Sequence, residues 1–293
     1  MPWFPDFFSA VELARRQTRA DGLADPVGEY FNALTNGDPA ELESIWPGEV
    51  VVYDPRAGEI RGHRQLRRFV RNNQLWLAER HASTTTLAST CIPGRAVVEL
   101  LVRLAAGSRP SETDHDQPDL QWPVAVVAES TSDTSVVFRT YCSQWPVDGQ
   151  RPVRPPILPT PPFEGGTGVG DVVAKYQSAL AAGDVDGVLE TFAEDGYYRE
   201  PSGRHPTHRG AGELRKFFAR QFSAGGIGIQ CCAVTDDGVR CGLEFNCVRW
   251  GEDELPAQAG LCVFERGPDG LLVAVRRYDD IQAPVGALRY EDG

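Results

Sequence analysis

The chain has 293 residues, of which 41% are hydrophobic and 24% are charged, so it can fill folded cores and is neither a mainly disordered nor a fibrous protein. At about 150 residues per domain, the length predicts two domains. The 41 acidic residues outnumber the 29 basic ones and give a net charge of −12, which would repel nucleic acid and anionic bilayers, so neither is an expected partner.

The first predicted element is an N-terminal helical segment, residues 1–22, which we expect to dock on the rest of the protein. A second helix is expected after Asp25, a capping residue, and Pro26, which suits the first helical turn. Its apolar residues recur at helical spacing until Gly37, a residue typical of helix ends. These apolar residues are Val27, Tyr30, Phe31 and Leu34.

A short helix is expected next, because Asp38-Pro39-Ala40-Glu41 offers a cap, a proline in the first turn and a glutamate three residues after the cap. Residues 50–53 then predict a strand that ends at Asp54-Pro55, and residues 65–77 predict a third helix of this half. Strand-like runs follow at residues 96–104, 124–129 and 136–144.

The stretch at residues 145–170 reads WPVDGQRPVRPPILPTPPFEGGTGVG and is rich first in proline and then in glycine. Such a composition leaves no room for a helix or a central strand. We therefore expect one domain at residues 23–147, a linker at residues 148–170 and a second domain at residues 171–293.

The two sides of this linker repeat one another. Residues 30–38 (YFNALTNGD) match residues 176–184 (YQSALAAGD), an offset of 176 − 30 = 146. The same offset matches Trp46 with Phe192 and Asp54-Pro55 with Glu200-Pro201. Later matches join Arg61-Gly62 to Arg209-Gly210, residues 66–70 to 214–218, and residues 138–141 to 275–278. A duplication of so long a period indicates two copies of one domain.

The second copy repeats the order of the first, with strands expected near residues 238–250, 258–265 and 271–281. Helices that come first and strands that come last indicate an α+β domain, in which an antiparallel sheet carries helices on one face.

Each copy resembles the nuclear transport factor 2-like superfamily, which includes ketosteroid isomerases and SnoaL-like polyketide cyclases. The resemblance rests on a tyrosine seven residues before Gly-Asp, a carboxylate before proline after the first strand, and Arg-Gly before the third helix. It implies tandem cone-shaped α+β barrels, each a curved antiparallel sheet wrapped around three helices and one apolar pocket. Domains of this kind commonly pair through their sheets, so two fused copies would form an internal pseudo-dimer, for which a monomer suffices.

Asp54 and Glu200 are the candidate proton carriers. A carboxylate at the rim of an apolar pocket loses solvation, so we expect its pKa to rise toward the range useful for proton transfer. Tyr30 and Tyr176 could donate to an oxygen that develops negative charge, and resemblance to ketosteroid isomerases implies these same two roles. The second donor of that family is a protonated Asp, whereas the aligned positions here fall at or near Cys262 and Val126.

Epoxide opening, a further reaction of this superfamily, needs two acidic groups. Glu200 with Glu244, or Asp54 with Glu99, could form such a pair. Asn246 lies two residues after Glu244, on the same face of a predicted strand. The residues expected to contact substrate are Glu244, Asn246, His208, Trp46 and Phe192.

Each candidate also has a structural interpretation. Tyr30 and Tyr176 could be core aromatics of amphipathic helices. Asp54 and Glu200 could be carboxylates that form turns, the interpretation favoured for Asp54. A solvated loop position is favoured for His208.

We expect neither a metal nor a cofactor. Five of the seven cysteines lie in the second half without a Cys-x-x-Cys pair, and the five histidines do not interleave with them, which favours free thiols. The start MPWFPD lacks the basic residues of a signal peptide, and no apolar run approaches the roughly 20 residues that span a bilayer. We therefore expect a cytoplasmic protein.

These residues predict a cofactor-independent acid–base enzyme of isomerase, cyclase or epoxide-hydrolase type. Its substrate would be a small apolar oxygenated ring compound, steroid-like or polyketide-like, with Glu200 as the base and Tyr176 as the donor. The alternative is a non-catalytic module of the same fold that binds a small ligand or a protein. A third interpretation combines one active cone with one degenerate copy.

Overall fold

The computed structural model describes residues 26–105, 120–132, 134–159, 169–203 and 205–284. The chain divides into two compact units, residues 1–150 and residues 151–293. The helical segment predicted at residues 1–22 lies outside the described residues. Within the described residues, no helix is long and apolar enough to cross a membrane.

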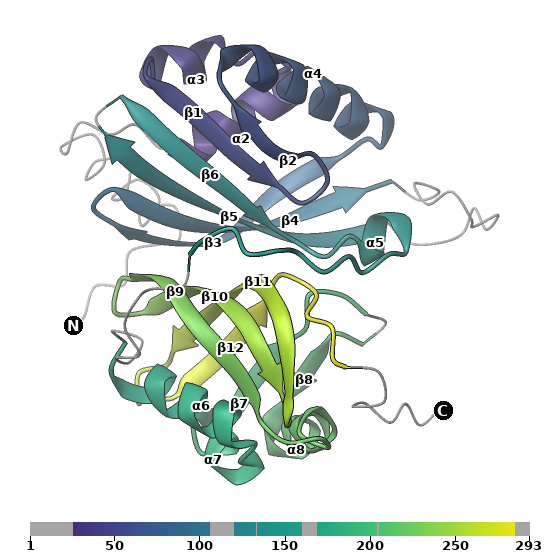
Figure 1. Ribbon diagram of the computed structural model, residues 1–293, viewed down its shortest axis with the longest axis vertical. Coiled ribbons are helices and arrows are strands. Elements are labelled where there is room, and N and C mark those ends of the chain that lie inside the picture. The colour runs from purple at the N-terminus through teal and green to yellow at the C-terminus, as the bar shows by residue number, and fades with distance from the viewer. Residues whose placement is uncertain (1–25, 106–119, 133, 160–168, 204, 285–293) are drawn as a thin grey trace. The chain divides into compact units, whose positions relative to one another are not determined.

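The first unit is a six-stranded sheet with three helices against one face (Figure 1). Its strands lie in the order β2-β1-β6-β5-β4-β3. In chain order its elements are α2 (Pro26–Asn36), α3 (Ala40–Ile45), β1 (Glu49–Asp54), β2 (Gly58–Arg61), α4 (His63–Glu79), β3 (Ser83–Ile92), β4 (Arg95–Leu104), β5 (Leu120–Ser132), β6 (Ser135–Tyr141) and the short α5 (Trp145–Asp148).

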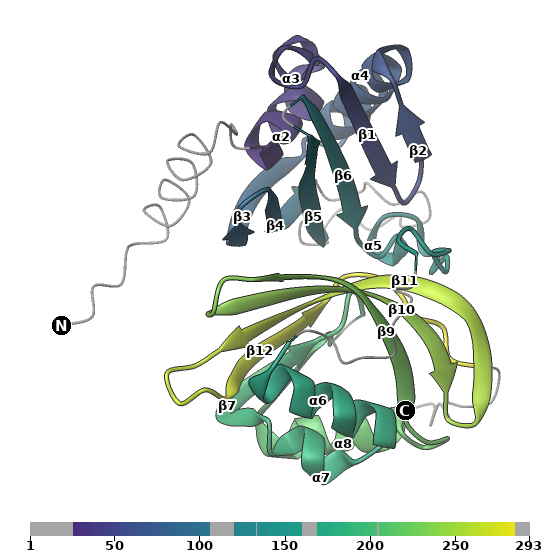
Figure 2. The ribbon, with the colours of Figure 1, turned by 60° about the vertical axis from the view of Figure 1, so that its left-hand side comes forward.

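Apart from α5, the second unit has the same order of elements, and its sheet, β8-β7-β12-β11-β10-β9, matches the first strand for strand. Figure 2 shows this sheet curving around its helices. Its elements are α6 (Asp171–Ala182), α7 (Val185–Leu189), β7 (Phe192–Arg199), β8 (Thr207–Arg209), α8 (Gly210–Gln221), β9 (Ile227–Asp236), β10 (Arg240–Trp250), β11 (Asp253–Arg266) and β12 (Leu272–Arg277). The two units are therefore two copies of one α+β fold, as predicted.

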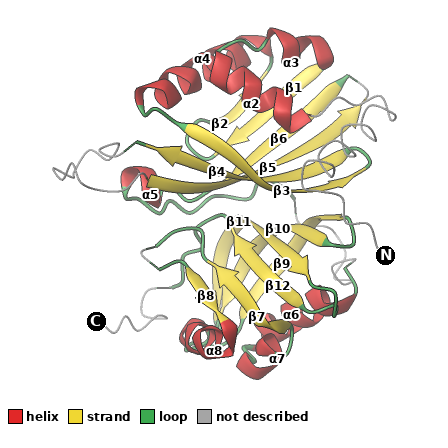
Figure 3. Ribbon diagram, turned by 180° about the vertical axis from the view of Figure 1, so that it is seen from behind, coloured by secondary structure: helices red, strands yellow, loops and turns green. Residues whose placement is uncertain are grey.

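Two details of the sheets differ from the sequence prediction (Figure 3). The sheets are not wholly antiparallel, because β1 pairs with β6, and β7 with β12, in parallel. The long chain between the two members of each pair allows this direction. The strands β2, β3, β8 and β9 were also not predicted. Strands β2 and β8 are only four and three residues long, and β3 is a polar, largely exposed edge strand.

A glycine ends the first helix of each copy for the same reason. Gly37 and Gly183, 146 residues apart, have φ of 74° and 71°, a left-handed conformation that glycine adopts without a steric penalty. The next residue then caps the following turn: Asp38 accepts a hydrogen bond from Ala40 N (2.9 Å) and Asp184 from Gly187 N (3.0 Å). The repeat found in the sequence is thus a repeated helix–turn–helix.

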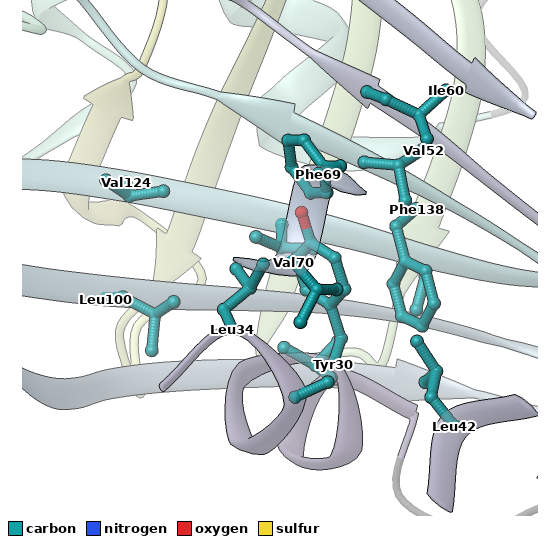
Figure 4. Close-up of a cluster of buried hydrophobic side chains, with 14 of the residues drawn as sticks. Tyr30, Leu34, Leu42, Val52, Ile60, Phe69, Val70, Leu100, Val124 and Phe138 are labelled. Carbon is teal, nitrogen blue, oxygen red and sulfur yellow. The ribbon is translucent and has the colours of Figure 1, made fainter. Parts of the chain in front are cut away.

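The interior of the first unit is packed with side chains (Figure 4). The Tyr30 ring stacks on Phe138 at 4.5 Å between centroids, and Trp46 meets the same Phe138 edge-on at 6.0 Å. Residues from α4 and from the β1–β2 hairpin, including Val52, Ile60, Phe69 and Val70, complete this cluster.

Both units carry the same ionic cluster on three adjacent strands. In the first unit Glu129 on β5 pairs with Arg95 on β4 (3.3 Å) and Arg139 on β6 (2.7 Å). In the second unit, Glu265 pairs with Arg240 (3.2 Å) and Arg276 (2.9 Å) from the corresponding strands. Arg139 and Arg276 are 2% and 5% exposed, so each carboxylate compensates a buried cation.

The described part of the predicted linker is held on the second unit. We call residues 151–158 the strap. The backbone N–H of Ala259 on β11 donates to Arg154 O (2.9 Å), and Asn246 Nδ2 donates to Leu158 O (3.3 Å). The guanidinium of Arg154 lies 3.9 Å from the Asp279 carboxylate. The prediction of no helix in residues 145–170 is wrong at its start, because α5 occupies Trp145–Asp148. The strap itself contains no helix or strand, and the contacts above hold it against the second unit.

Candidate active site

The second unit contains a small apolar pocket of about 50 Å³ between its helices and the inner face of its sheet. Most of its walls are aromatic or aliphatic, and a few polar groups reach it from α6, β7 and β12. Its lining residues are Tyr176, Leu180, Tyr198, Phe217, Phe218, Gln221, Ile227, Ile229, Phe245, Cys247, Trp250, Cys262, Phe264, Arg277 and Ile281. An apolar cavity with few polar groups is typical of small-molecule sites.

Two buried phenols lie in this pocket. Tyr176 on α6 is 3% exposed, and its ring meets Phe264 at 5.3 Å and Phe218 at 6.2 Å, both edge-on. Burial, followed by the nearby Tyr198, raises the pKa of Tyr176 well above its usual value. Burial likewise raises the pKa of Tyr198 on β7. Both hydroxyls therefore stay protonated at neutral pH and can donate hydrogen bonds.

Arg277, the last residue of β12, brings a positive charge to the pocket wall. Burial alone would lower its pKa, but the nearby Tyr198 and Glu200 oppose this effect, and the pKa of Arg277 is raised. The guanidinium is thus a permanent cation beside two phenols, a combination that can stabilise an oxyanion.

Glu200 and His208 form a hydrogen-bonded pair next to this wall. Glu200 Oε1 and His208 Nε2 are 3.0 Å apart, and both side chains are 19% exposed. Burial pushes the pKa of Glu200 upward, but the His208 hydrogen bond and the charges of Arg277 and Arg220 outweigh it, so its pKa is lowered. The expectation that burial would raise this pKa is wrong, because three cationic or donor groups surround the carboxylate.

A stack of three rings connects His208 to the pocket. The imidazole lies 4.3 Å from the Phe217 ring at an interplanar angle of 22°, and Phe217 lies 4.7 Å from Tyr198 at 29°. Phe217 and Tyr198 line the pocket, whereas His208 lies behind them. The favoured interpretation of His208 as a solvated loop residue is wrong, since it belongs to β8, stacks on Phe217 and is hydrogen-bonded to Glu200.

The structure places Glu244 and Asn246 on the outer face of the sheet. Their neighbours on β10, Phe245 and Cys247, line the pocket, and successive residues of a strand face opposite sides. Asn246 instead bonds to the strap. The pair of Glu200 with Glu244 that an epoxide hydrolase would use is therefore not brought together.

The predicted residues of the first unit lie in its core, in a turn or on the outer face of its sheet. Tyr30 and Trp46 are each 1% exposed and packed on Phe138. Asp54 Oδ1 accepts hydrogen bonds from the backbone N–H groups of Arg56 (2.9 Å) and Ala57 (2.8 Å), as a turn-forming carboxylate does. Glu99 on β4 alternates with the core residue Leu100, so it faces away from the interior.

The repeat explains why the two interiors differ. Tyr198 and His208 are paired across β7–β8, and Val52 and Ile60 are the matching pair across β1–β2. The matched segments 275–278 and 138–141 place Thr140 where the second unit has Arg277. At the three positions where the second unit has Tyr198, His208 and Arg277, the first unit therefore has smaller or aliphatic residues. Phe192, matched to Trp46, meets the ring of Tyr176 edge-on at 6.1 Å from behind.

Tyr198 and Arg277 are the functional candidates that sequence reasoning missed. Both sit in pairs of like residues, Tyr197-Tyr198 and Arg276-Arg277, and only one member of each pair faces the pocket. The replacement of Thr140 by Arg277 within matched segments was the signal that could have found the arginine. In the part of the chain that the structure describes, no group of three or more His, Cys, Asp or Glu residues could hold a metal ion.

Comparison with known proteins finds a family match within the second unit. Residues 173–275 match the sequence profile of the SnoaL-like domain. Similar solved structures include a Sinorhizobium meliloti protein provisionally assigned as a polyketide cyclase (19% identity, 38% of this chain and 95% of that one, TM-score 0.33). Others are the epoxide hydrolase/cyclase-like enzyme SalBIII of salinomycin pyran-ring formation (21%, 38% and 88%, TM-score 0.31) and an NTF2-like protein of unknown function from Cytophaga hutchinsonii (13%, 41% and 95%, TM-score 0.31).

Proposed function

Because residues 173–275 form a SnoaL-like domain, we propose that the second unit is an acid–base enzyme that moves a proton on a small, largely apolar oxygenated compound. The observation that carries this proposal is the presence of one half-buried guanidinium, Arg277, and two protonated phenols, Tyr176 and Tyr198, among the residues that line one apolar pocket. Such groups stabilise the oxyanion that forms when a proton leaves the carbon next to a carbonyl.

The Glu200–His208 pair would carry the proton. With its pKa lowered, Glu200 is an ionised carboxylate at neutral pH, so it accepts the hydrogen bond and His208 Nε2–H donates it. When the imidazole carries only this Nε2 proton, its Nδ1 has a lone pair that can accept a substrate proton. Arg277 and the two phenols would hold the substrate oxygen, and Glu200 would orient the imidazole.

The pocket size restricts the substrate. A volume of about 50 Å³ holds a few heavy atoms, since one water needs roughly 10–15 Å³ on this measure. We therefore propose that a carbonyl-bearing fragment enters first. A fused ring system, steroid-like or polyketide-like, would require lining side chains such as Phe245 and Ile281 to move.

A second candidate function, ligand binding without turnover, is favoured by one observation. Glu200 and His208 lie behind Phe217 and Arg277 rather than among the lining residues. If those two side chains keep their positions when a ligand is bound, the pocket captures an oxygenated ligand and moves no proton.

Deuterium incorporation from D2O into a panel of small cyclic ketones, followed by mass spectrometry, tests the enzyme. We expect exchange above the buffer rate, a loss of about 100-fold in Arg277→Met, and no change in Arg215→Met, an exposed arginine of α8. Exchange that is equal in wild type and Arg277→Met would overturn the mechanism. Binding that Arg277→Met weakens, without exchange in the wild type, would establish the second function instead.

A further inference from the structure

We propose that the first unit has a separate site for a small organic anion, in a cleft between the β1–β2 hairpin and α4. The cleft measures about 310 Å³, the low end of the range for small-molecule sites. We call it the α4 cleft. Its lining residues are Asp54, Arg56, Ala57, Glu59, Ile60, Gln65, Arg68, Phe69, Asn72, Asn73 and Trp76.

The α4 cleft has an apolar floor and a polar rim. Ile60 and Phe69, two of its lining residues, are 5% and 6% exposed and belong to the core cluster drawn in Figure 4. Arg56, Arg68 and Asn72 are exposed at the rim. This arrangement suits a ligand with an apolar body and one charged end.

The carboxylates of the cleft are already engaged. Asp54 accepts two backbone hydrogen bonds from the turn that follows β1. Glu59 is ion-paired with Arg61, its Oε1 lying 2.9 Å from Nε. Asp54 Oδ1 and Glu59 Oε1 are therefore bonded to groups other than the guanidinium groups of Arg56 and Arg68.

Arg56 and Arg68, by contrast, have no carboxylate partner among the described residues. Two further exposed arginines of α4, Arg64 and Arg71, are also without an ion pair there. Arg64, Arg68 and Arg71 are three or four residues apart on α4, so they share one face of this helix, and they bring local positive charge to a chain of net charge −12. The α4 cleft therefore favours an anion.

Arg56 is held ready for such a ligand. Its guanidinium lies 4.1 Å from the centroid of the Trp76 ring, and its Nη2 donates to Asn73 Oδ1 at 3.2 Å. Stacking on an indole leaves the N–H groups of a guanidinium available, and those of Arg56 that are not bonded to Asn73 can donate two parallel hydrogen bonds, which carboxylates and phosphates both accept. The site thus selects an organic carboxylate or phosphate monoester whose apolar part rests on Ile60 and Phe69.

Calorimetric titration of the full chain at low ionic strength tests the site with benzoate, phenyl phosphate, benzyl alcohol and inorganic phosphate. We expect saturable binding of benzoate or phenyl phosphate, the tighter one identifying the preferred head group, and at least tenfold weaker binding of the other two probes. The double variant Arg56→Ala/Arg68→Ala should weaken the tighter ligand at least tenfold. Both side chains are exposed, so it should keep the wild-type melting temperature.

Arg103→Ala/Arg215→Ala is the matched control, because it removes the same charge from exposed positions outside the cleft. Equal weakening by both double variants, or benzyl alcohol binding as tightly as benzoate, would overturn the proposal. Arg277→Met should leave the binding unchanged, and a loss in that variant would place the anion in the second unit instead. Failure of the enzyme test leaves this result unaffected, since the two sites share no residue.

Discussion

Tyr198 and His208 stand directly opposite each other across β7–β8, and Phe217 stacks against both of their rings. In the first unit, Val52 and Ile60 occupy the same opposed positions and belong to the core. The β1–β2 hairpin thus contributes aliphatic side chains to the first unit, whereas the corresponding β7–β8 hairpin contributes polar aromatic side chains to the second. This single pair supports assigning acid–base chemistry to the second unit alone.

The two matched tyrosines should respond differently to loss of the hydroxyl. Tyr176→Phe should lower the ketone exchange rate about 100-fold, because one oxyanion donor is lost. Tyr30→Phe should leave the rate unchanged, since Tyr30 is packed in the filled first cone. Parallel rate measurements check this, and an equal loss in both variants would contradict the assignment to the second unit.

Glu200 should stabilise the second unit above acidic pH. Its lowered pKa means that the ionised form is favoured by folding, so this stability is present above the unfolded-state pKa near 4.5 and disappears as the pH falls through the lower folded-state pKa. In melting curves from pH 3 to 7, Glu200→Gln should have a shallower acid limb than wild type. Glu190→Gln, an exposed control, should keep the wild-type curve, and identical acid limbs for all three proteins would refute the effect.

Asp279 should have the opposite pH dependence. It is 3% exposed, and burial, partly offset by Arg154, raises its pKa to about 7. The folded state therefore binds this proton more tightly than the unfolded state, and stability falls as the pH rises from about 4 to about 7.

Asp279→Asn carries no charge to bury, so at pH 8 it should melt at a higher temperature than wild type, and at pH 5 the gap should narrow. The exposed Asp195→Asn should show no such difference. A variant that melts lower than wild type at pH 8 would mean that the ion pair with Arg154 outweighs the burial of the charge.

The repeated ionic clusters should contribute to stability. Glu265→Gln removes the negative charge shared by Arg240 and the buried Arg276, and should cost about 2 kcal/mol in the free energy of unfolding. Glu254→Gln, at an exposed position of the same strand, should cost almost nothing. Urea unfolding of both variants measures the difference, and equal midpoints would show that the cluster is energetically neutral.

The duplication made much of the fold predictable. Repeated sequence features such as Tyr30–Asp38 and Tyr176–Asp184 located the helices and the first strand of each copy. Strand β3 was missed because its exposed run of serine and threonine lacks the alternation of a half-buried strand. The parallel pairs β1–β6 and β7–β12 join residues about 80 positions apart, and nothing local in either strand encodes that direction.

The site was only partly predictable, because which side of a strand faces the core depends on how the strand is paired. Glu200 and Tyr176 were named from the motif. Arg277 and Tyr198 were missed, and Glu244 was expected in the pocket, since a shift of one residue moves a side chain to the other face. The downward pKa shift of Glu200 needed the positions of His208, Arg220 and Arg277, which come from three different elements.

The strap determines the residue at which an expressed fragment of the second half should begin. A fragment that started after the proline- and glycine-rich run would contain every helix and strand of the second unit. It would nevertheless lose the backbone oxygens of Arg154 and Leu158, to which Ala259 and Asn246 donate hydrogen bonds. It would also lose the arginine beside Asp279. An expression fragment of the second half therefore has to begin at Arg151, so that it includes the strap and its hydrogen bonds to β10 and β11.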